Sequence, residues 1–342
     1  MTKAIIVGFG SAGQQYFRIL KKNKSIEKIY IIDKEISEKF NKYKITTEEI
    51  KKNKIFFDFA FIATPSNLHF KYAEFFLKRK SHVLIEKPFV LKISDGKKLI
   101  KLSKKVKKKC WTALQNRYNL ATKELKNSIK KNELGKIVMV NCSMFWSRDK
   151  KYYSNGWRGK YISDGGVLTN QAIHLLDLLI YLIGDIRYFS AIAGFNKKKL
   201  EAEDLITINI RHNNDNYSSF SATTRANIDY QSSIDLIGEK GRSRVTGISL
   251  NIYQKYIKNR FVKFAKYSEN FSKGIGAVRG MGNGHEKILS EFLQKNNKNS
   301  SCGLEIEKNI YTIKVIHSIY NYIHSKNFLL KSVTDRQGIL GK

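Results

Sequence analysis

Short apolar runs alternate with amphipathic stretches over roughly the first 115 residues of the chain. The first run ends in glycines, the second in an aspartate, and the third and fourth are followed within three residues by a proline. The stretches between the runs carry apolar side chains at helical spacing. We expect strands at residues 4–7, 28–32, 57–63, 82–85 and 111–114, with helices between them. Strands and helices that alternate in this way form a parallel, doubly wound sheet, so the pattern predicts an α/β fold.

The pattern changes at about residue 119. A polar helix, a strand over residues 137–145 and an apolar helix over residues 168–183 come first. Residues 186–256 then carry a series of short strands joined by polar or glycine-containing turns. The strands are expected at residues 191–195, 205–211, 218–225, 232–237 and 244–248, and helices return at residues 284–294 and 305–325. Neighbouring strands without helices between them favour an antiparallel sheet. The sequence therefore predicts a second domain, of the α+β class, after the first.

Composition fits a folded protein of roughly two domains, with 342 residues of which 42% are hydrophobic. The formal net charge is +34, from 63 Lys and Arg against 29 Asp and Glu. Only 13 of these basic residues are arginine, the side chain that reads bases and phosphates best. We interpret the charge as a lysine-coated surface and expect no nucleic-acid partner. The alternatives that charge alone leaves open are nucleic-acid binding and attraction of anionic small substrates.

The three cysteines, Cys110, Cys142 and Cys302, form no CxxC pair and no zinc spacing. We therefore expect neither a disulfide framework nor a metal site, and a reducing cytoplasm as the location. Residues 165–184 are apolar enough to suggest a membrane span, but they include three polar side chains that would be costly in hydrocarbon. We expect a buried helix there, a soluble protein and no membrane partner.

A glycine-rich turn follows the first expected strand and opens the first expected helix. It reads Gly8-Phe9-Gly10-Ser11-Ala12-Gly13. Gly8 permits the tight turn, Gly10 lets the backbone approach a pyrophosphate at the helix N-terminus, and Gly13 lets helix and strand pack closely. Asp33 ends the second strand 20 residues later, where a carboxylate can hold both ribose hydroxyls and repel a 2′-phosphate. The sequence predicts a dinucleotide site that favours NAD, with NADP as the alternative because Lys34 stands beside Asp33.

Both prolines follow expected parallel strands, at the edge where open α/β sheets bind ligands. They lie in the segments Ala63-Thr64-Pro65-Ser66-Asn67 and Glu86-Lys87-Pro88-Phe89. Ending a strand is a sufficient role for Pro65. It is a weaker explanation for Pro88, because a charged Glu-Lys pair at the end of a buried strand is costly without a function.

A polar stripe crosses the apolar helix expected at residues 168–183. Asn170, His174 and Asp177 fall at positions i, i+4 and i+7, after a Gly165-Gly166 entry, and would share one face. A single histidine on such a helix is usually a satisfied core residue. Three polar groups in register indicate a functional site instead.

Taken in order, these motifs resemble the Gfo/Idh/MocA oxidoreductases, which include glucose–fructose oxidoreductase and inositol dehydrogenases. The resemblance covers nearly the whole chain. It implies an NAD(P)-binding Rossmann domain over residues 1–118. It also implies a substrate-binding and oligomerisation domain over residues 119–342, with a large, open-faced, mostly antiparallel sheet. From it we expect a homodimer or a homotetramer.

The resemblance also implies site residues. Lys87 and His174 would be the catalytic pair, and the segment from Gln115 to Asn119 would line the nicotinamide and the substrate. Many family members have Asp where this chain has Asn170, although an Asn-Gln variant is found among nucleotide-sugar-type relatives. The expected cofactor contacts are Gly8, Phe9, Gly10, Ser11, Ala12, Gly13, Asp33, Lys34, Ala63, Thr64, Pro65, Asn67, His69, Glu86, Lys87, Gln115 and Arg117.

An aromatic and basic loop at residues 146–160 leads into the helix with the polar stripe. Aromatic faces suit sugar rings, and arginines can fork onto carboxylate or phosphate oxygens. The alternative is a surface loop whose aromatic side chains fold onto the sheet. The expected substrate contacts are Asn170, Arg148, Tyr152, Trp157, Arg158 and Asp177.

From these features we predict an NAD(P)-dependent dehydrogenase of a secondary alcohol of a sugar, leading with a nucleotide-linked or acidic sugar of surface-polysaccharide biosynthesis. His174 is the expected acid/base, because its ordinary pKa of ~6.5 needs almost no shift, whereas Lys87 would need roughly 3 units. Protonated Lys87 would polarise the substrate oxygen, and Asn170 would orient the hydroxyls. The alternatives are an inositol, cyclitol or free-sugar dehydrogenase, and a non-catalytic dinucleotide-sensing protein.

Overall fold

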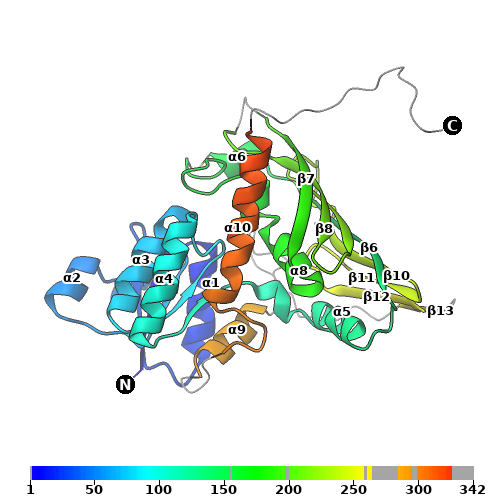
Figure 1. The fold of residues 1–342 in the computed structure, drawn as a ribbon. Helices are drawn as coiled ribbons and strands as arrows, with labels where there is room; N and C mark the ends of the chain where they lie inside the picture. Colours follow the sequence, from blue (N-terminus) through cyan, green and yellow to red (C-terminus); the bar gives the residue numbers. More distant parts are fainter. Residues whose placement is uncertain are drawn as a thin grey trace, which may run out of the picture.

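Two β-sheets organise the molecule, with a long helix between them (Figure 1). The structure is a computed structural model that describes residues 2–154, 156–196, 200–257, 260–263, 284–294 and 299–325. The long helix, α10 (Ile306–Ile323), packs against elements of both halves: α4 and β5 on one side, α8 and β7 on the other.

The first sheet has five parallel strands in the order β2-β1-β3-β4-β5. The strands are β1 (Lys3–Val7), β2 (Lys28–Ile32), β3 (Phe59–Ile62), β4 (His82–Ile85) and β5 (Cys110–Thr112). Each lies within two residues of where the hydrophobic pattern placed it. The predicted parallel, doubly wound α/β fold is confirmed.

Helices cover both faces of this sheet because successive strand residues point to opposite sides. Ala4 and Ile6 pack toward α1 (Ser11–Lys22). Ile5 and Val7 pack on the other side with α2 (Thr47–Lys52), α3 (His69–Lys78) and α4 (Ile93–Val106). The sequence pattern had not indicated α2 or the 3₁₀ turn at Glu38–Tyr43.

The far end of the chain completes the core of the first sheet. Helix α9 (Gly284–Phe292) lies on the same face as α1, and the Phe292 ring stands 5.3 Å from Trp111 and 5.7 Å from Phe59, centroid to centroid. On the opposite face, Ile313 of α10 joins the cluster around α4. Helical periodicity predicted both helices but not this packing, because an apolar stripe does not specify its partner.

The second sheet has eight strands in the order β13-β12-β11-β10-β6-β9-β8-β7. All neighbouring pairs among these strands are antiparallel except β6 with β9, which is parallel. The strands are β6 (Ile137–Phe145), β7 (Ile186–Gly194), β8 (Leu205–His212), β9 (Tyr217–Thr223), β10 (Gln231–Gly238), β11 (Gly241–Thr246), β12 (Ile252–Ile257) and β13 (Arg260–Lys263). The mostly antiparallel sheet is confirmed, and β12 and β13 extend it beyond the expected strands.

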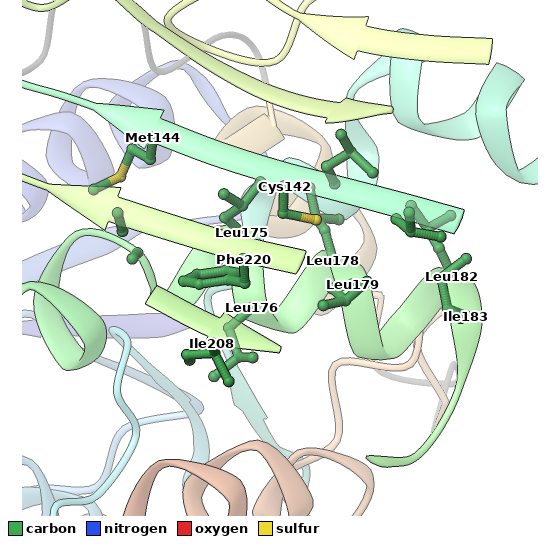
Figure 2. Close-up of a cluster of buried hydrophobic side chains, with 14 of the residues drawn as sticks. Cys142, Met144, Leu175, Leu176, Leu178, Leu179, Leu182, Ile183, Ile208 and Phe220 are labelled. Carbon is green, nitrogen blue, oxygen red and sulfur yellow. The ribbon is translucent and has the colours of Figure 1, made fainter. Parts of the chain in front are cut away.

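One face of the second sheet is covered and the other is open. Leu175, Leu176 and Leu179 of α8 (Ile173–Ile183) pack on Cys142 of β6 and Phe220 of β9 (Figure 2). Helix α5 (Leu120–Lys130) contributes to the same cluster. Large side chains such as those of Val138, Tyr188, Ile192, Tyr217 and Tyr256 are exposed. Among the described helices, none has both the length and the apolar character that crossing a membrane requires.

The prediction of one continuous helix over residues 168–183 is wrong. The segment folds as α7 (Val167–Asn170) and α8, with a turn at Gln171 and Ala172 between them. In a continuous helix the carbonyl of Asn170 would accept the N–H of His174. Here that carbonyl accepts a hydrogen bond from Lys87 Nζ at 2.7 Å. A side chain that inserts into the backbone ladder is a known cause of helix breaks.

Truncation of Phe292 tests whether α9 belongs to the core of the first sheet. Phe292→Ala should lower the free energy of unfolding by about 3–5 kcal/mol, the usual cost of emptying a buried phenylalanine site. The matched control is Phe56→Ala, because Phe56 is 64% exposed and its loss should change stability by less than about 0.5 kcal/mol. Urea denaturation measures both variants. Equal effects of the two substitutions would contradict the packing described here.

Candidate functional site

The turn between β1 and α1 forms a cradle of backbone. Gly8 has φ +91°, and a Cβ added there would lie 2.4 Å from the carbonyl oxygen of Ala63. A Cβ on Gly13 would lie 2.0 Å from the carbonyl oxygen of Gly8. A Cβ on Gly10, in contrast, would meet no described atom within 4 Å. Two glycines are therefore required by close packing, and the third leaves open space at the N-terminus of α1, which has no side-chain cap.

Asp33 lies at the rim of this cradle. Its carboxylate accepts hydrogen bonds from the backbone N–H of Phe9, within the glycine turn, and from that of Glu35 at 3.0 Å. Lys34 beside it is exposed. A helix N-terminus with uncapped N–H groups suits a diphosphate, and a fixed carboxylate suits ribose hydroxyls. The residues present fit a dinucleotide.

The loops after β3 and β4 are joined by His69. Its Nδ1 lies 2.7 Å from the carbonyl oxygen of Pro88 and its Nε2 lies 2.9 Å from that of Thr64. Burial lowers the pKa of His69, and the hydrogen bonds to the two carbonyl oxygens act in the opposite direction. This geometry supports a structural role for His69, whereas Asn67 is exposed and could reach a ligand.

A cavity of about 480 Å³ lies next to the end of β4. It brings together both expected catalytic residues, Lys87 and His174, with Asn170 and Gln115. Arg148 and Tyr152 of the aromatic loop also reach it. The expected segment after β5 and the aromatic loop add Asn116, Trp146, Ser147 and Asp149. The walls that sequence reasoning had not identified are Met144, Gln171, Leu175, Asp229, Ser232, Ile248, Ser249 and Leu250.

Lys87 is held at the floor of this cavity by Asn170. Its Nζ donates to the carbonyl oxygen of Asn170 at 2.7 Å and lies 3.5 Å from the side-chain Oδ1 of the same residue. Burial lowers the pKa of Lys87, and the carboxylates of Glu86 and Asp164 act in the opposite direction. Two nearby carboxylates thus help a buried ammonium to remain charged.

His174 needs a correction. The sequence suggested an almost unshifted pKa, but burial, reinforced by the positive charge of Lys87, holds the pKa of His174 well below 6.5. Its Nε2 lies 3.4 Å from Nε2 of Gln115, and its buried Nδ1 has no hydrogen-bond partner among the described residues. An amide nitrogen only donates, so Nε2 of His174 accepts in this contact and the proton of the neutral ring lies on Nδ1.

Glu86 faces away from Asn170. Its carboxylate accepts a hydrogen bond from the hydroxyl of Tyr16 on α1 and lies 3.6 Å from Nε2 of His285 on α9. Although burial acts to raise it, His285 and Tyr16 lower the pKa of Glu86 to about 2. Neither partner had been identified from the sequence, since both are distant along the chain from the Glu-Lys-Pro segment.

Both arginines of the aromatic loop lie against the ring of Tyr152. The guanidinium of Arg148 lies 5.3 Å from the Tyr152 ring centroid and pairs with Asp229 at 2.9 Å. Arg158 lies 4.1 Å from the same centroid and donates to the carbonyl oxygen of Tyr152 at 3.0 Å. Arg148 lines the cavity, whereas Arg158 and Trp157 are not among its walls.

Two predicted ligand contacts form a structural ion pair instead. Asp177, 1% exposed, accepts from Nε of Arg117 at 2.8 Å and also pairs with its terminal nitrogen. Arg117 further donates to the carbonyl oxygens of Cys302 and Gly303 and to Asn309 of α10. The prediction that Asp177 binds substrate and Arg117 binds cofactor is revised accordingly: together they fasten the segment after β5 to α8 and α10.

Comparisons with known proteins place the chain in a family. The model of the "Oxidoreductase family, NAD-binding Rossmann fold" matches residues 2–114. The model of the "GFO/IDH/MocA C-terminal domain" matches residues 122–244. The chain is 23% identical to the myo-inositol 2-dehydrogenase of Thermotoga maritima, over 70% of this chain and 67% of that protein. It is also 23% identical to the D-glucoside 3-dehydrogenase of Escherichia coli, over 41% of this chain but only 38% of that protein.

Solved structures share the whole arrangement of the chain. The WlbA dehydrogenase of Chromobacterium violaceum, in complex with NADH and UDP-GlcNAcA, superposes with a TM-score of 0.79 at 24% identity. The superposition covers 94% of this chain and 93% of that one. At this identity the likeness establishes the fold.

Replacement of Asp33 tests how the cradle reads a dinucleotide. We expect the wild-type protein to bind NAD(H) more tightly than NADP(H), because a carboxylate at this place repels a 2′-phosphate. Asp33→Ala should narrow the difference between the two dissociation constants, measured by fluorescence titration. Glu35→Ala is the control, since Glu35 contributes only its backbone N–H to this contact. A wild-type preference for NADP(H) would refute the assignment.

Proposed function

Because the chain belongs to the Gfo/Idh/MocA family of NAD-binding oxidoreductases, we propose that it oxidises a secondary alcohol of a sugar, or reduces the corresponding ketone. The observation that carries the proposal is the meeting of Lys87 and His174 in one cavity beside the carboxyl end of β4. An ammonium and a neutral imidazole at the same place supply the two functions that a carbinol oxygen needs, charge stabilisation and proton exchange.

The residues of the glycine turn, Asp33 and the loops after β3 and β4 would hold the cofactor. Bound NAD supplies the hydride acceptor for oxidation, and its reduced form supplies the donor in reverse. Everything else falls to side chains of this chain. Gln115 follows the last parallel strand and lies within reach of His174, so it would set the orientation of the imidazole.

We assign proton exchange to His174 and charge stabilisation to Lys87. The neutral imidazole of His174 takes the hydroxyl proton on Nε2, in place of the hydrogen bond from Gln115, while Nδ1 keeps its own proton. Lys87 donates to the backbone carbonyl of Asn170 and, at 3.5 Å, to its side-chain oxygen, and an ammonium has three donors. The remaining donor can approach the substrate oxygen, on which negative charge develops during oxidation.

Substitution of the catalytic pair tests this assignment. Lys87→Ala and His174→Ala should each lower turnover by on the order of 10²–10⁴-fold and leave NAD binding largely intact. In the wild-type protein, any fall of kcat/KM for oxidation that reports protonation of free His174 should lie below pH 6.5, because burial and Lys87 hold its pKa below that value. Steady-state kinetics across pH measure both effects. Near-wild-type turnover in either variant would remove that residue from the mechanism.

We propose an anionic, nucleotide-linked sugar as the substrate, with a neutral cyclitol as the second candidate. Trp146, Tyr152 and Arg148 give the cavity aromatic faces and a guanidinium, which suit sugar rings and carboxylate or phosphate oxygens. Arg148 already pairs with Asp229, so an anionic substrate would have to share or displace that partner. The UDP-GlcNAcA bound to the WlbA dehydrogenase favours the first candidate, and the myo-inositol 2-dehydrogenase favours the second.

Arg148→Ala separates the two substrate classes. We expect the KM for a UDP-linked hexosaminuronate to rise at least tenfold, the order lost with a charge-assisted hydrogen bond, and the KM for a neutral polyol to change little. Arg158→Ala is the matched comparison and should have the smaller effect, because Arg158 lies behind Tyr152. Turnover is followed by NADH absorbance over a panel of sugars. An enzyme that oxidises free inositol or glucose and ignores every nucleotide sugar offered contradicts this choice.

A non-catalytic dinucleotide-sensing protein is the alternative of another class, and the presence of both Lys87 and His174 in the cavity speaks against it. The open face of the second sheet, with exposed side chains such as Tyr188 and Ile192, supports assembly into a homodimer or homotetramer. The three cysteines of the chain are free and buried, which suits a reducing cytoplasm as its location.

A further inference from the structure

A buried carboxylate stands directly behind the amide that holds Lys87. Asp164 is 2% exposed, and its Oδ2 accepts a hydrogen bond from the side-chain Nδ2 of Asn170 at 2.6 Å. A second, longer contact comes from the backbone N–H of Gly159 at 3.4 Å. Asp164 does not line the cavity, and the sequence motifs did not identify it as a site residue.

The partners fix the orientation of the Asn170 amide. A carboxylate can only accept a hydrogen bond and an ammonium can only donate one. The amide nitrogen must therefore face Asp164, and the amide oxygen must face Lys87, as observed at 2.6 and 3.5 Å. The Asn170 amide thus stands between Asp164 and the ammonium of Lys87, with the negative end of its dipole toward the ammonium.

The local backbone holds Asp164 in this place. Gly165, which follows it, has φ +76°, a conformation that side chains rarely adopt. A Cβ on Gly166 would lie 2.1 Å from Oε2 of Glu203. The diglycine is therefore required for the chain to turn from Asp164 into α7, which places the carboxylate six positions before the amide yet against it.

We propose that Asp164 is a positioning residue of the site, whose carboxylate orients Asn170 and balances the charge of Lys87. Asn170 then occupies the place where a directly contacting carboxylate would otherwise stand, and the charge lies one side chain further back. This inference rests on the proposed function only where it makes Lys87 a catalytic residue. The electrostatic part can be tested without any substrate.

Other charged groups also act on the pKa of Lys87, and the test must separate their effects from that of Asp164. The carboxylate of Glu86 raises the pKa of Lys87 more than Asp164 does, while Arg158 and Arg148 lower it. Glu86 is already paired with His285 and Tyr16, so it does not orient Asn170. Burial raises the pKa of Asp164, and the hydrogen bond from Asn170 together with the charges of Lys87 and Arg158 opposes this rise.

The test measures the protonation of Lys87 in the intact protein. Labelling of the Lys87 amine by acetic anhydride across pH, read by peptide mass spectrometry, gives a midpoint for its deprotonation. Asp164→Asn should lower this midpoint by roughly one pH unit, because an opposite charge is removed from the ammonium's surroundings. Asp235→Asn is the matched control: Asp235 is another buried carboxylate, paired with Arg242 on the second sheet, and its loss should leave the midpoint unchanged. An unchanged midpoint in folded Asp164→Asn protein overturns the proposal.

A second variant keeps the test decisive if Asp164→Asn does not fold. The double variant D164N/N170D exchanges amide and carboxylate across the same contact, so one donor and one acceptor remain. It should fold, and its Lys87 midpoint should lie above the wild-type value because the carboxylate now stands next to Nζ. A midpoint at or below the wild-type value, or failure of the exchanged protein to fold, overturns the proposal.

Kinetics then distinguish the two levels of inference. If the proposed function holds, Asp164→Asn should lower kcat by on the order of tenfold, with KM and the NAD dissociation constant near wild type. A larger rise in KM than fall in kcat contradicts a positioning role. A shifted labelling midpoint in a protein that oxidises no sugar leaves the electrostatic inference standing and defeats the proposed function alone.

Discussion

The hydrogen bond from Lys87 Nζ to the backbone carbonyl of Asn170 joins the two halves of the molecule at the site. Lys87 lies two residues after Ile85, the last residue of β4, so its position is set by the parallel sheet. Asn170 ends α7 and is set by the second domain. This single contact places an ammonium at the turn between α7 and α8, on the carbonyl that would accept the N–H of His174 in a continuous helix.

A buried ion pair keeps these two halves in register. Arg117, directly after β5, contacts Asp177 on α8 and Asn309 on α10. Such pairs add little net stability relative to apolar side chains of similar size, yet the loss of one partner strands a buried charge. The pair therefore acts mainly on geometry: it allows one relative placement of β5, α8 and α10. Since Gln115 and His174 lie on two of the joined segments, the same pair sets the distance between them.

Sequence periodicity predicted the strands of the parallel sheet closely, because each is a buried apolar run bounded by glycine, aspartate or proline. It also placed β6 through β11 approximately. It did not predict the break at Gln171, where the carbonyl of Asn170 accepts a hydrogen bond from a lysine 83 positions away, because such a contact leaves no local signal. The same limit applies to Arg117 and Asp177, whose residue types fit either a ligand or an ion pair. Among the candidate site residues, the structure brings Lys87, His174, Asn170, Gln115, Arg148 and Tyr152 around one cavity, whereas burial decided against a ligand role for His69.

The electrostatics of the cavity depend on an unequal distribution of burial and charge. Lys87 and His174 both lose solvent, and each would be driven toward its neutral form by burial alone. Glu86 and Asp164 oppose this for Lys87. Glu86 also raises the pKa of His174, but burial and the charges of Lys87 and His285 lower it, so the pKa stays well below the ordinary value. Two bases in one cavity thus acquire different protonation states, and each state favours the other: a charged lysine keeps the histidine neutral, and a neutral histidine adds no repulsion to the lysine. The proposed oxidation, in which the site would both stabilise an alkoxide and accept a proton, requires that division. It follows here from the carboxylates around the lysine, Glu86 and Asp164, which act on its pKa.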